Sequence, residues 1–230
     1  MALVKHGAGV VQMSGSIAGT THARNRFGNY CRARTKPVNP NTVNQGVIRT
    51  ALSYLTTYWH EKLTSSQRTA WNTYAAAITM NNRLGESIYL TGFNHFVRSN
   101  IVRIQASQVL CPDAPTILSL PDKDPAFAVA ASAATQMLTI TWEDTLPWSD
   151  IAASVLCLWM GVPQLITRNF FNGPWRFTGS IPGNGESPTE KNAIMTLVEG
   201  QKVWVYARVS TGPTDSRLSE PFFAVCVVAA

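Results

Sequence analysis

The hydrophobic periodicity of this chain changes near Gln108, and this change limits the fold more than any other feature of the sequence. Before Gln108, apolar residues recur at spacings of three and four, which predicts amphipathic helices. The segment QVLCPDAPTILSLPDKDP follows, with four prolines and no helical period. Beyond it, apolar and polar residues alternate in short runs, which predicts strands. Helices followed by strands indicate an α+β chain with consecutive domains.

The helical domain is expected to span residues 39–107 and to contain three helices joined by short turns. The expected N-terminal caps are Asn39 or Asn41 for the first helix and Thr64, with Gln67 in a capping box, for the second; the third helix is expected to start at Thr91. Each helix carries an apolar stripe on one face, so the three stripes are expected to pack together. The residues expected to build this core are Trp71, Tyr74, Phe93 and Phe96.

The strand-rich part is expected to form an antiparallel β-sandwich over residues 126–230, with residues 108–125 as the linker and first segment of that domain. Five runs have strand character and are separated by Gly, Pro, Asn and Ser clusters. They are AFAVAAS, QMLTITWED, ASVLCLWMG, VWVYARVS and FFAVCVVA. Regular strand spacing with turn signals is typical of sandwiches.

This second half resembles a fibronectin type III domain from roughly Cys111 to Ala230. The residues that carry the resemblance are Ala114-Pro115, the strand LTITWED, the late strand VWVYARVS and the closing segment SRLSEPFFAV. The resemblance implies an immunoglobulin-like binding or spacer module without catalysis. The insert NFFNGPWRFTGSIPGNGESPTEKN is longer than a typical hairpin loop, so the edge strands around it stay unassigned.

Residues 1–38 are rich in Gly, Ser, Thr and Arg and are expected to form an extended basic arm. Between His22 and Lys36 the basic residues occupy alternate positions, which places them on one side of a continuous strand. The residues predicted to contact a partner are Arg24, Arg26, Phe27, Tyr30, Arg32, Arg34 and Lys36. We expect this arm to become ordered only on a neighbouring subunit, because it holds few large apolar groups.

A hairpin is the alternative for the same segment, with Gly28-Asn29 as its turn. Opposite residues in an antiparallel pair share a face. The single charged side would then be lost, because Arg24 would face Ala33 and the two arginine pairs would lie on different faces. The charge alternation therefore favours the extended arm, while the turn-forming Gly-Asn pair favours the hairpin.

Three motifs in the first half occur in order within residues 14–100: ARNRFGNYCRARTKPVNPNT, LTSSQRTAWN and LTGFNHFVRSN. In these motifs the chain resembles a group of uncharacterised tailed-phage and prophage proteins. The resemblance implies a structural component of a virion, made in the cytoplasm of a host bacterium. It does not specify the part of the particle.

The sequence offers no recognised catalytic frame. No GxSxG, HExxH or Walker motif is present, and none of the cysteines Cys31, Cys111, Cys157 and Cys226 has metal-ligand spacing. We therefore expect no enzyme activity, no cofactor, no metal and no intrachain disulfide. No apolar run suits a signal peptide or a membrane span, so we expect no membrane partner.

Charge is distributed unevenly along the chain. Residues 1–110 carry twelve Lys or Arg and two Asp or Glu, whereas residues 111–230 carry seven and eleven. The first half is therefore strongly basic and the second weakly acidic, which indicates regions with different tasks. Charged residues make up only 14% of the chain, which suggests either that other subunits cover much of its surface or that the chain is a well-buried two-domain monomer.

These features predict a structural subunit of a bacteriophage particle. The most concrete role is an auxiliary capsid protein, a decoration or cement protein whose basic arm binds the major capsid protein, other virion proteins or sister copies. A tail or neck protein is the alternative within the virion. A nucleic-acid-binding protein that contacts packaged DNA is the alternative of another class, because arginines interleaved with aromatic residues suit phosphates and bases. A secreted adhesion module is the third alternative, and the missing signal peptide disfavours it.

Overall fold

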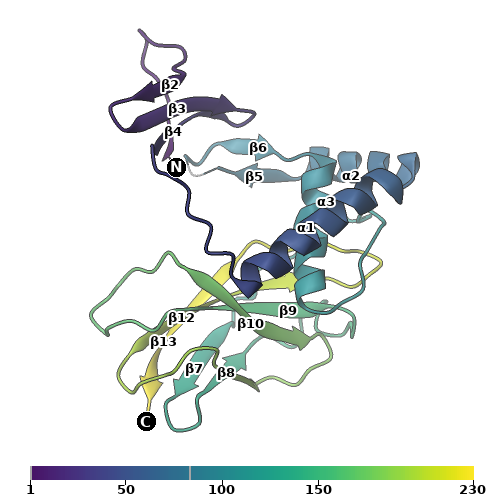
Figure 1. Ribbon diagram of the computed structural model, residues 1–230. Coiled ribbons are helices and arrows are strands. Elements are labelled where there is room, and N and C mark those ends of the chain that lie inside the picture. Colours follow the sequence, from purple (N-terminus) through teal and green to yellow (C-terminus); the bar gives the residue numbers. More distant parts are fainter. Residues whose placement is uncertain (1, 83) are drawn as a thin grey trace.

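The computed structural model describes residues 2–82 and 84–230, which fold into three consecutive parts. Figure 1 shows a small N-terminal sheet, a group of three helices with a short hairpin, and a larger sheet that holds the C-terminus. The mixed α+β class and the order of helices before strands agree with the sequence analysis. The fold of the first part differs from the expected one.

The N-terminal residues form a four-stranded sheet in the order β1-β4-β3-β2, so the prediction of one extended arm is wrong. Its strands are β1 (Ala2–Leu3), β2 (Gly15–Ile17), β3 (Thr20–Asn25) and β4 (Gly28–Ala33). The turn between β3 and β4 explains the difference. The side-chain oxygen of Asn25 accepts a hydrogen bond from the backbone N–H of Phe27 at 2.9 Å, and Gly28 adopts a φ of 120°. This local chemistry reverses the chain at Arg26 and Phe27.

The helices begin where side chains satisfy their first backbone N–H groups. Helix α1 (Val43–Glu61) is capped by Thr42 with Gln45, and not by Asn39 or Asn41 as expected. The two asparagines instead accept hydrogen bonds from the Arg49 side chain. The predictions for the other two helices are confirmed: helix α2 (Ser65–Ala77) starts at the Thr64–Gln67 capping box, and helix α3 (Gly92–Gln105) starts after Thr91, which is its N-cap.

A cluster of aromatic rings forms the core between the helices. The ring of Phe96 is fully buried and lies 5.5 Å from that of Trp59 and 5.6 Å from that of Trp71, measured between centroids. Tyr74 is also buried, while Phe93 packs on the cluster and is partly buried. The chain crosses from α2 to α3 through strands β5 (Thr79–Asn81) and β6 (Ser87–Tyr89), which form an antiparallel pair. The predicted helical core is thus largely confirmed.

The larger sheet has seven strands in the order β10-β9-β12-β13-β7-β8-β11. The strands are β7 (Ala128–Ser132), β8 (Met137–Thr141), β9 (Val155–Gly161), β10 (Trp175–Pro182), β11 (Thr189–Asn192), β12 (Lys202–Ser210) and β13 (Phe222–Ala229). Neighbouring strands are antiparallel except β13 and β7, which run parallel. All five expected runs form strands, and the unassigned insert supplies β10 and β11. The sheet curls so that its two end strands, β10 and β11, approach each other.

The inner face of this sheet is a continuous aliphatic core. Its buried members alternate along β12 and β8 as the sequence pattern predicted. They include Leu138, Ile140, Leu156, Leu158, Val203 and Val205. The outward residues of β9 are also buried, because α3 lies across them: Val102 and Ala106 pack with Val155, Cys157 and Trp159. The helices therefore cover one end of the outer sheet face.

The close approach of α2 and α3 generates a first prediction, at Gly92. A Cβ atom there would lie 2.7 Å from the backbone nitrogen of Asn72 and 2.8 Å from the carbonyl carbon of Trp71. Because backbone atoms cannot yield easily, we expect Gly92→Ala to lower the free energy of unfolding by about 1–3 kcal/mol. Gly46→Ala is the matched control, because Gly46 lies inside α1 with open space around it.

Gly46→Ala should raise stability by about 0.5–1 kcal/mol, since alanine loses less backbone entropy in a helix. Both effects are measured from urea unfolding curves followed by circular dichroism. Equal stability of the two variants would contradict the packing of α3 on α2.

Candidate functional site

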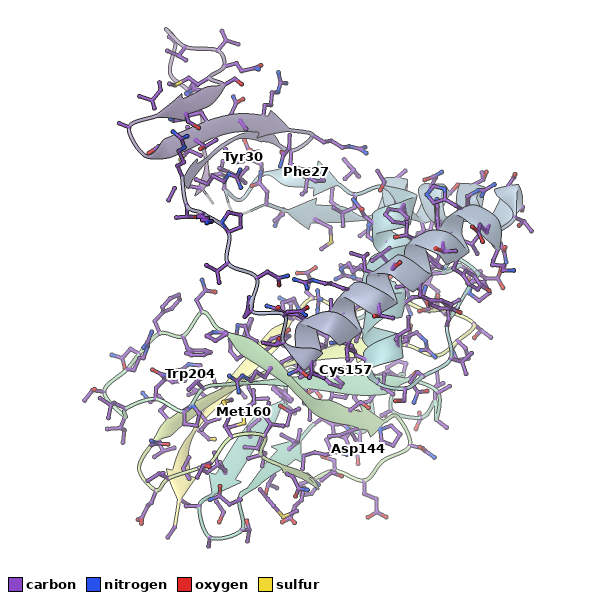
Figure 2. The ribbon with its side chains drawn as sticks, viewed as in Figure 1. Phe27, Tyr30, Asp144, Cys157, Met160 and Trp204 are labelled. Atoms are coloured by element: carbon purple, nitrogen blue, oxygen red, sulfur yellow. The ribbon has the colours of Figure 1, made fainter. Side chains whose placement is uncertain are left out.

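The residues predicted to bind a partner all lie in the N-terminal sheet and the linker after it. The five cations Arg24, Arg26, Arg32, Arg34 and Lys36 are exposed, whereas Phe27 and Tyr30 are partly buried. Figure 2 shows Phe27 and Tyr30 at this end of the molecule, well apart from Asp144 in the turn that follows β8 of the larger sheet. The structure therefore collects the predicted residues in one module and does not align them on one face.

Strand pairing distributes the arginines over both faces of the sheet. Arg24 lies opposite Asn29, and Thr21 lies opposite Arg32. Opposite residues share a face, and neighbours along a strand alternate. Arg24 therefore shares its face with Asn29, while Arg32 shares the other face with Tyr30. The hairpin considered in the sequence analysis used Gly28-Asn29 as its turn; the actual turn is Arg26-Phe27, two residues earlier.

These cations have no carboxylate partner among the described residues. The ion pairs found there are Lys5–Glu86, Arg98–Glu220 and Arg217–Asp215. Arg24 donates a hydrogen bond to the side chain of Gln12 at 3.2 Å, which orients it without neutralising it. The N-terminal sheet thus presents uncompensated positive charge to the solvent.

The sheet is held against the helical part by contacts to the β5–β6 hairpin. Lys5 forms an ion pair with Glu86, and this interaction holds the pKa of the Glu86 carboxyl below its usual value. Phe27 and Leu84 line the same shallow hollow beside this ion pair. Arg26 lines a second hollow of about 430 Å³ together with Asn72 and Tyr89. The turn of the β3–β4 hairpin therefore lies beside the helices, while the Arg26 side chain stays exposed.

A second group of polar side chains is buried where α3 meets the larger sheet. Arg103 donates hydrogen bonds at 2.8 Å to the carbonyl oxygens of Val109 and Thr211, and Arg98 donates to those of Leu218 and Ser219. Burial, with a smaller effect from the nearby Arg208, lowers the pKa of Arg98 to about 10, so the guanidinium still stays charged at neutral pH. Sequence reasoning missed this group, because spacing along α3 does not reveal which carbonyls lie opposite.

His95 is buried in the same region, beside Tyr74. The two rings meet edge to face at 5.2 Å, and neither His95 nitrogen has a hydrogen-bond partner among the described residues. Burial, with a smaller effect from Arg98, lowers the pKa of His95 to about 4. The histidine is therefore neutral at pH 7 and packs against the Tyr74 ring.

The cysteines are free thiols in the structure. Cys157 is fully buried, and burial raises the pKa of its thiol to about 12, so it stays protonated and unreactive. Within residues 2–82 and 84–230, no three His, Cys, Asp or Glu side chains lie close enough together to hold a metal ion.

An aromatic surface on the outer face of the larger sheet was not predicted as a site. Trp159 on β9, Trp175 on β10 and Tyr206 on β12 lie side by side there. The sequence did contain a signal for this surface. In β12, Trp204, Tyr206 and Arg208 occupy the outward positions and alternate with small apolar residues that point inward. Aromatic side chains on the outward positions of a strand indicate that the outer face is covered or used.

The buried histidine generates a prediction about pH. The pKa of His95 is depressed in the folded state, so the unfolded chain binds the proton more readily below its ordinary pKa of about 6.5. Stability should therefore fall as the pH falls from about 6.5 towards 4, with no effect of His95 above this window. His95→Gln should flatten this slope by at most about 1.4 kcal/mol per pH unit. Urea unfolding between pH 8 and 4 measures the slopes, and parallel profiles for the two proteins would contradict the prediction.

The exposed linker between the N-terminal sheet and α1 generates a prediction about proteolysis. Residues 34–42 are exposed and have no helix or strand, whereas Arg24 and Arg32 lie within paired strands. We expect limited trypsin digestion to cut first after Arg34, since Lys36 precedes a proline and such bonds resist trypsin. Sequencing of the fragment's N-terminus should give Thr35, and Arg34→Gln should protect this bond. First cuts inside β3 or β4 would show that the sheet does not form in the isolated protein.

None of the described helices has the length and apolarity that a membrane span requires. Comparisons of the chain with protein-family models, with curated proteins and with solved structures find no match.

Proposed function

We propose that this protein is a structural subunit of a bacteriophage virion, most concretely an auxiliary capsid protein that binds neighbouring subunits through its N-terminal sheet. The observation that carries the proposal is the exposed set of cations on this sheet and linker, which no carboxylate of the described chain neutralises. A surface of this kind suits an acidic partner. Arginine suits it particularly well, because a guanidinium makes two parallel hydrogen bonds to one carboxylate.

The three motifs of the phage resemblance support the proposal, because they form one connected unit. The first covers the β3–β4 hairpin and the linker, the second the start of α2, and the third the start of α3. The second and third meet directly: the backbone N–H of Gly92 donates to the side-chain oxygen of Asn72 at 3.2 Å. Trp71 of the second motif packs on Phe96 of the third. Residues of the second and third motifs thus hold α2 against α3, and Arg26 of the first motif lines a hollow beside Asn72 and Gly92.

Exposed apolar residues on the larger sheet are a further argument for assembly. Phe223, Val225 and Val227 point outward from β13, with 59%, 52% and 46% of their surface exposed. A contiguous apolar strip of this kind on a soluble surface indicates contact with another protein. A virion subunit with neighbours on two sides accounts for both the basic sheet and this strip.

We also propose that the larger sheet is a fibronectin type III-like sandwich. Its strand order supports this: β7, β8 and β11 lie on one side of the curled sheet, and β10, β9, β12 and β13 lie on the other. In immunoglobulin-like sandwiches the third, sixth and seventh strands likewise share one layer and the first, second and fifth share the other. An experimental structure in which β11 pairs with β10 and not with β8 would contradict this assignment.

A tail or neck protein would bind its neighbours through the same N-terminal sheet, but it would be present in fewer copies per particle than a capsid protein. Quantitative mass spectrometry of purified particles separates the two locations. Hundreds of copies per particle fit a protein that covers the capsid, whereas a ring of about six or twelve fits the tail or neck.

Binding to packaged DNA is the second candidate function, because Tyr30 and Arg32 lie on the same face of the sheet and suit a base and a phosphate. Lysine substitution distinguishes the two partners. Arg24, Arg26, Arg32 and Arg34 are all changed to Lys, and the control changes Arg168 and Arg176 of the larger sheet and its loop to Lys. Both variants keep the total charge.

We expect the four-fold N-terminal variant to enter particles at least about threefold less than the control, because lysine cannot replace the forked contacts to carboxylates. Incorporation is measured on purified virions, and DNA binding is measured at two salt concentrations. Normal incorporation together with DNA affinity that falls steeply with salt would overturn the proposal in favour of nucleic acid. Absence of the protein from purified particles would overturn both the capsid and the tail location.

A further inference from the structure

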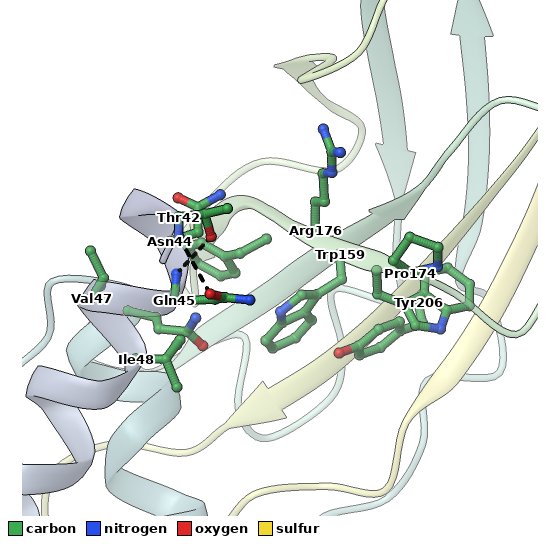
Figure 3. A pocket seen from close by; sticks show the side chains of 12 residues that line it. Thr42, Asn44, Gln45, Val47, Ile48, Trp159, Pro174, Arg176 and Tyr206 are labelled. Carbon is green, nitrogen blue, oxygen red and sulfur yellow. Dashed lines mark hydrogen bonds between the residues drawn. The ribbon is translucent and has the colours of Figure 1, made fainter. Parts of the chain in front are cut away.

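We propose that a groove between the helices and the outer face of the larger sheet is a binding site for a neutral oligosaccharide. The groove encloses about 880 Å³ and is formed by the first turns of α1, the last residue of α3 and the strands β9, β10 and β12. Figure 3 shows Gln45 and Ile48 of α1 facing Trp159 and Tyr206 of the sheet across this space. The site is independent of the basic N-terminal sheet and of the function proposed for it.

The floor of the groove is a rigid platform of aromatic rings. Trp159 and Tyr206 stack with centroids 4.7 Å apart and planes 5° from parallel. Trp175 meets Tyr206 edge to face at 5.0 Å, and Phe177 meets Trp159 at 5.4 Å. Trp159 is nearly buried at the bottom, while the other three rings are half-buried and border the open space. Rings held by mutual contacts offer a large apolar area with little loss of entropy on binding.

The walls carry neutral groups that both donate and accept hydrogen bonds. These are the hydroxyl of Thr42 and the amides of Asn44, Gln45 and Gln105. Gln45 is oriented by the capping box of α1, in which its side-chain oxygen accepts from the backbone of Thr42 at 3.3 Å. Its Nε2 donor is not part of that box. Figure 3 shows these hydrogen bonds at the rim of the groove.

The charges of the lining favour a neutral ligand. Arg176 is its one side chain charged at pH 7, and it is exposed. Tyr206 stays protonated there, because burial raises the pKa of its hydroxyl. A pyranose matches this lining: its C–H face packs on aromatic rings, and its hydroxyls both donate to and accept from amides.

Other ligand classes match the lining less well. A wholly apolar ligand would leave three amides without partners, which costs free energy. A single-stranded nucleic acid needs several cations along its phosphates, and one arginine supplies only one such contact. A proline-rich peptide also favours aromatic grooves, but its prolines offer no N–H donor to the amide oxygens of the wall. The mixed donors and acceptors therefore favour the sugar.

The test uses the full chain and three neutral probes, chitohexaose, cellohexaose and maltohexaose, which differ in linkage and substituents. Binding is followed by tryptophan fluorescence, since two indoles line the groove. We expect a saturable change for at least one probe, with half-saturation at about 1 mM or below. Oligo(dT) and a proline-rich peptide are titrated in parallel.

Two variants locate the binding and one controls for it. Trp175→Ala removes a platform ring, and Asn44→Ala removes an exposed amide with no part in the core. We expect Trp175→Ala to weaken binding at least about tenfold and Asn44→Ala to weaken it at least about threefold. Phe170→Ala is the control, because Phe170 is 70% exposed near the start of β10 and does not line the groove. Circular dichroism confirms that each variant is folded.

If Trp175→Ala is not folded, Asn44→Ala carries the test alone. No saturable response to any of the three sugars overturns the proposal. An equal response in Asn44→Ala and the wild type overturns it too, as does a response to oligo(dT) or the peptide alone.

Discussion

Helix α3 connects the two halves of this protein because it belongs to both of their cores. Phe96 on one side of α3 packs into the aromatic cluster of the helices, and Val102 on another side packs on β9 of the larger sheet. Arg98 and Arg103 extend from the same helix to backbone carbonyls in the β12–β13 connection, at Leu218 and Thr211. A charged guanidinium with several carbonyl acceptors is tolerated in a buried place, whereas an unpaired one is not. The orientation of the helices on the sheet therefore depends on these contacts.

Two surfaces follow from this arrangement, and they differ in chemistry. The N-terminal sheet lies beyond the helices on an exposed linker and concentrates uncompensated positive charge. The groove lies on the other side, where the end of α3 and the start of α1 stop short of covering the aromatic strands. One surface suits a partner with carboxylates, and the other suits a neutral ligand with apolar faces. In the proposed virion subunit, the first surface would join neighbours and would leave the second free for another ligand.

The sequence was informative where the deciding interaction is local. Thr64 with Gln67 was predicted as a capping box and forms one, and the third helix starts at Thr91 as predicted, because the bonds that define these ends join residues three positions apart. For the first helix, local patterns did not identify the correct cap. Asn41 precedes the helix as expected of a cap, but Thr42 has a glutamine three residues later and so forms the reciprocal pair. The alternating pattern of β12 was likewise sufficient to separate its inward valines from its outward aromatic residues.

By itself, the sequence determined the helices, most of the strands, the break near Gln108 and the unequal distribution of charge. Tertiary structure alone decided which of these residues meet. A period of two is the same for a single strand and for both strands of a hairpin, so the charge pattern from His22 to Lys36 did not reveal the turn at Arg26 and Phe27. The groove unites Gln45, Gln105, Trp159 and Tyr206 from four distant segments. Residues so far apart in the chain come together only through the packing of α1 and α3 on the sheet, and no local pattern records that packing.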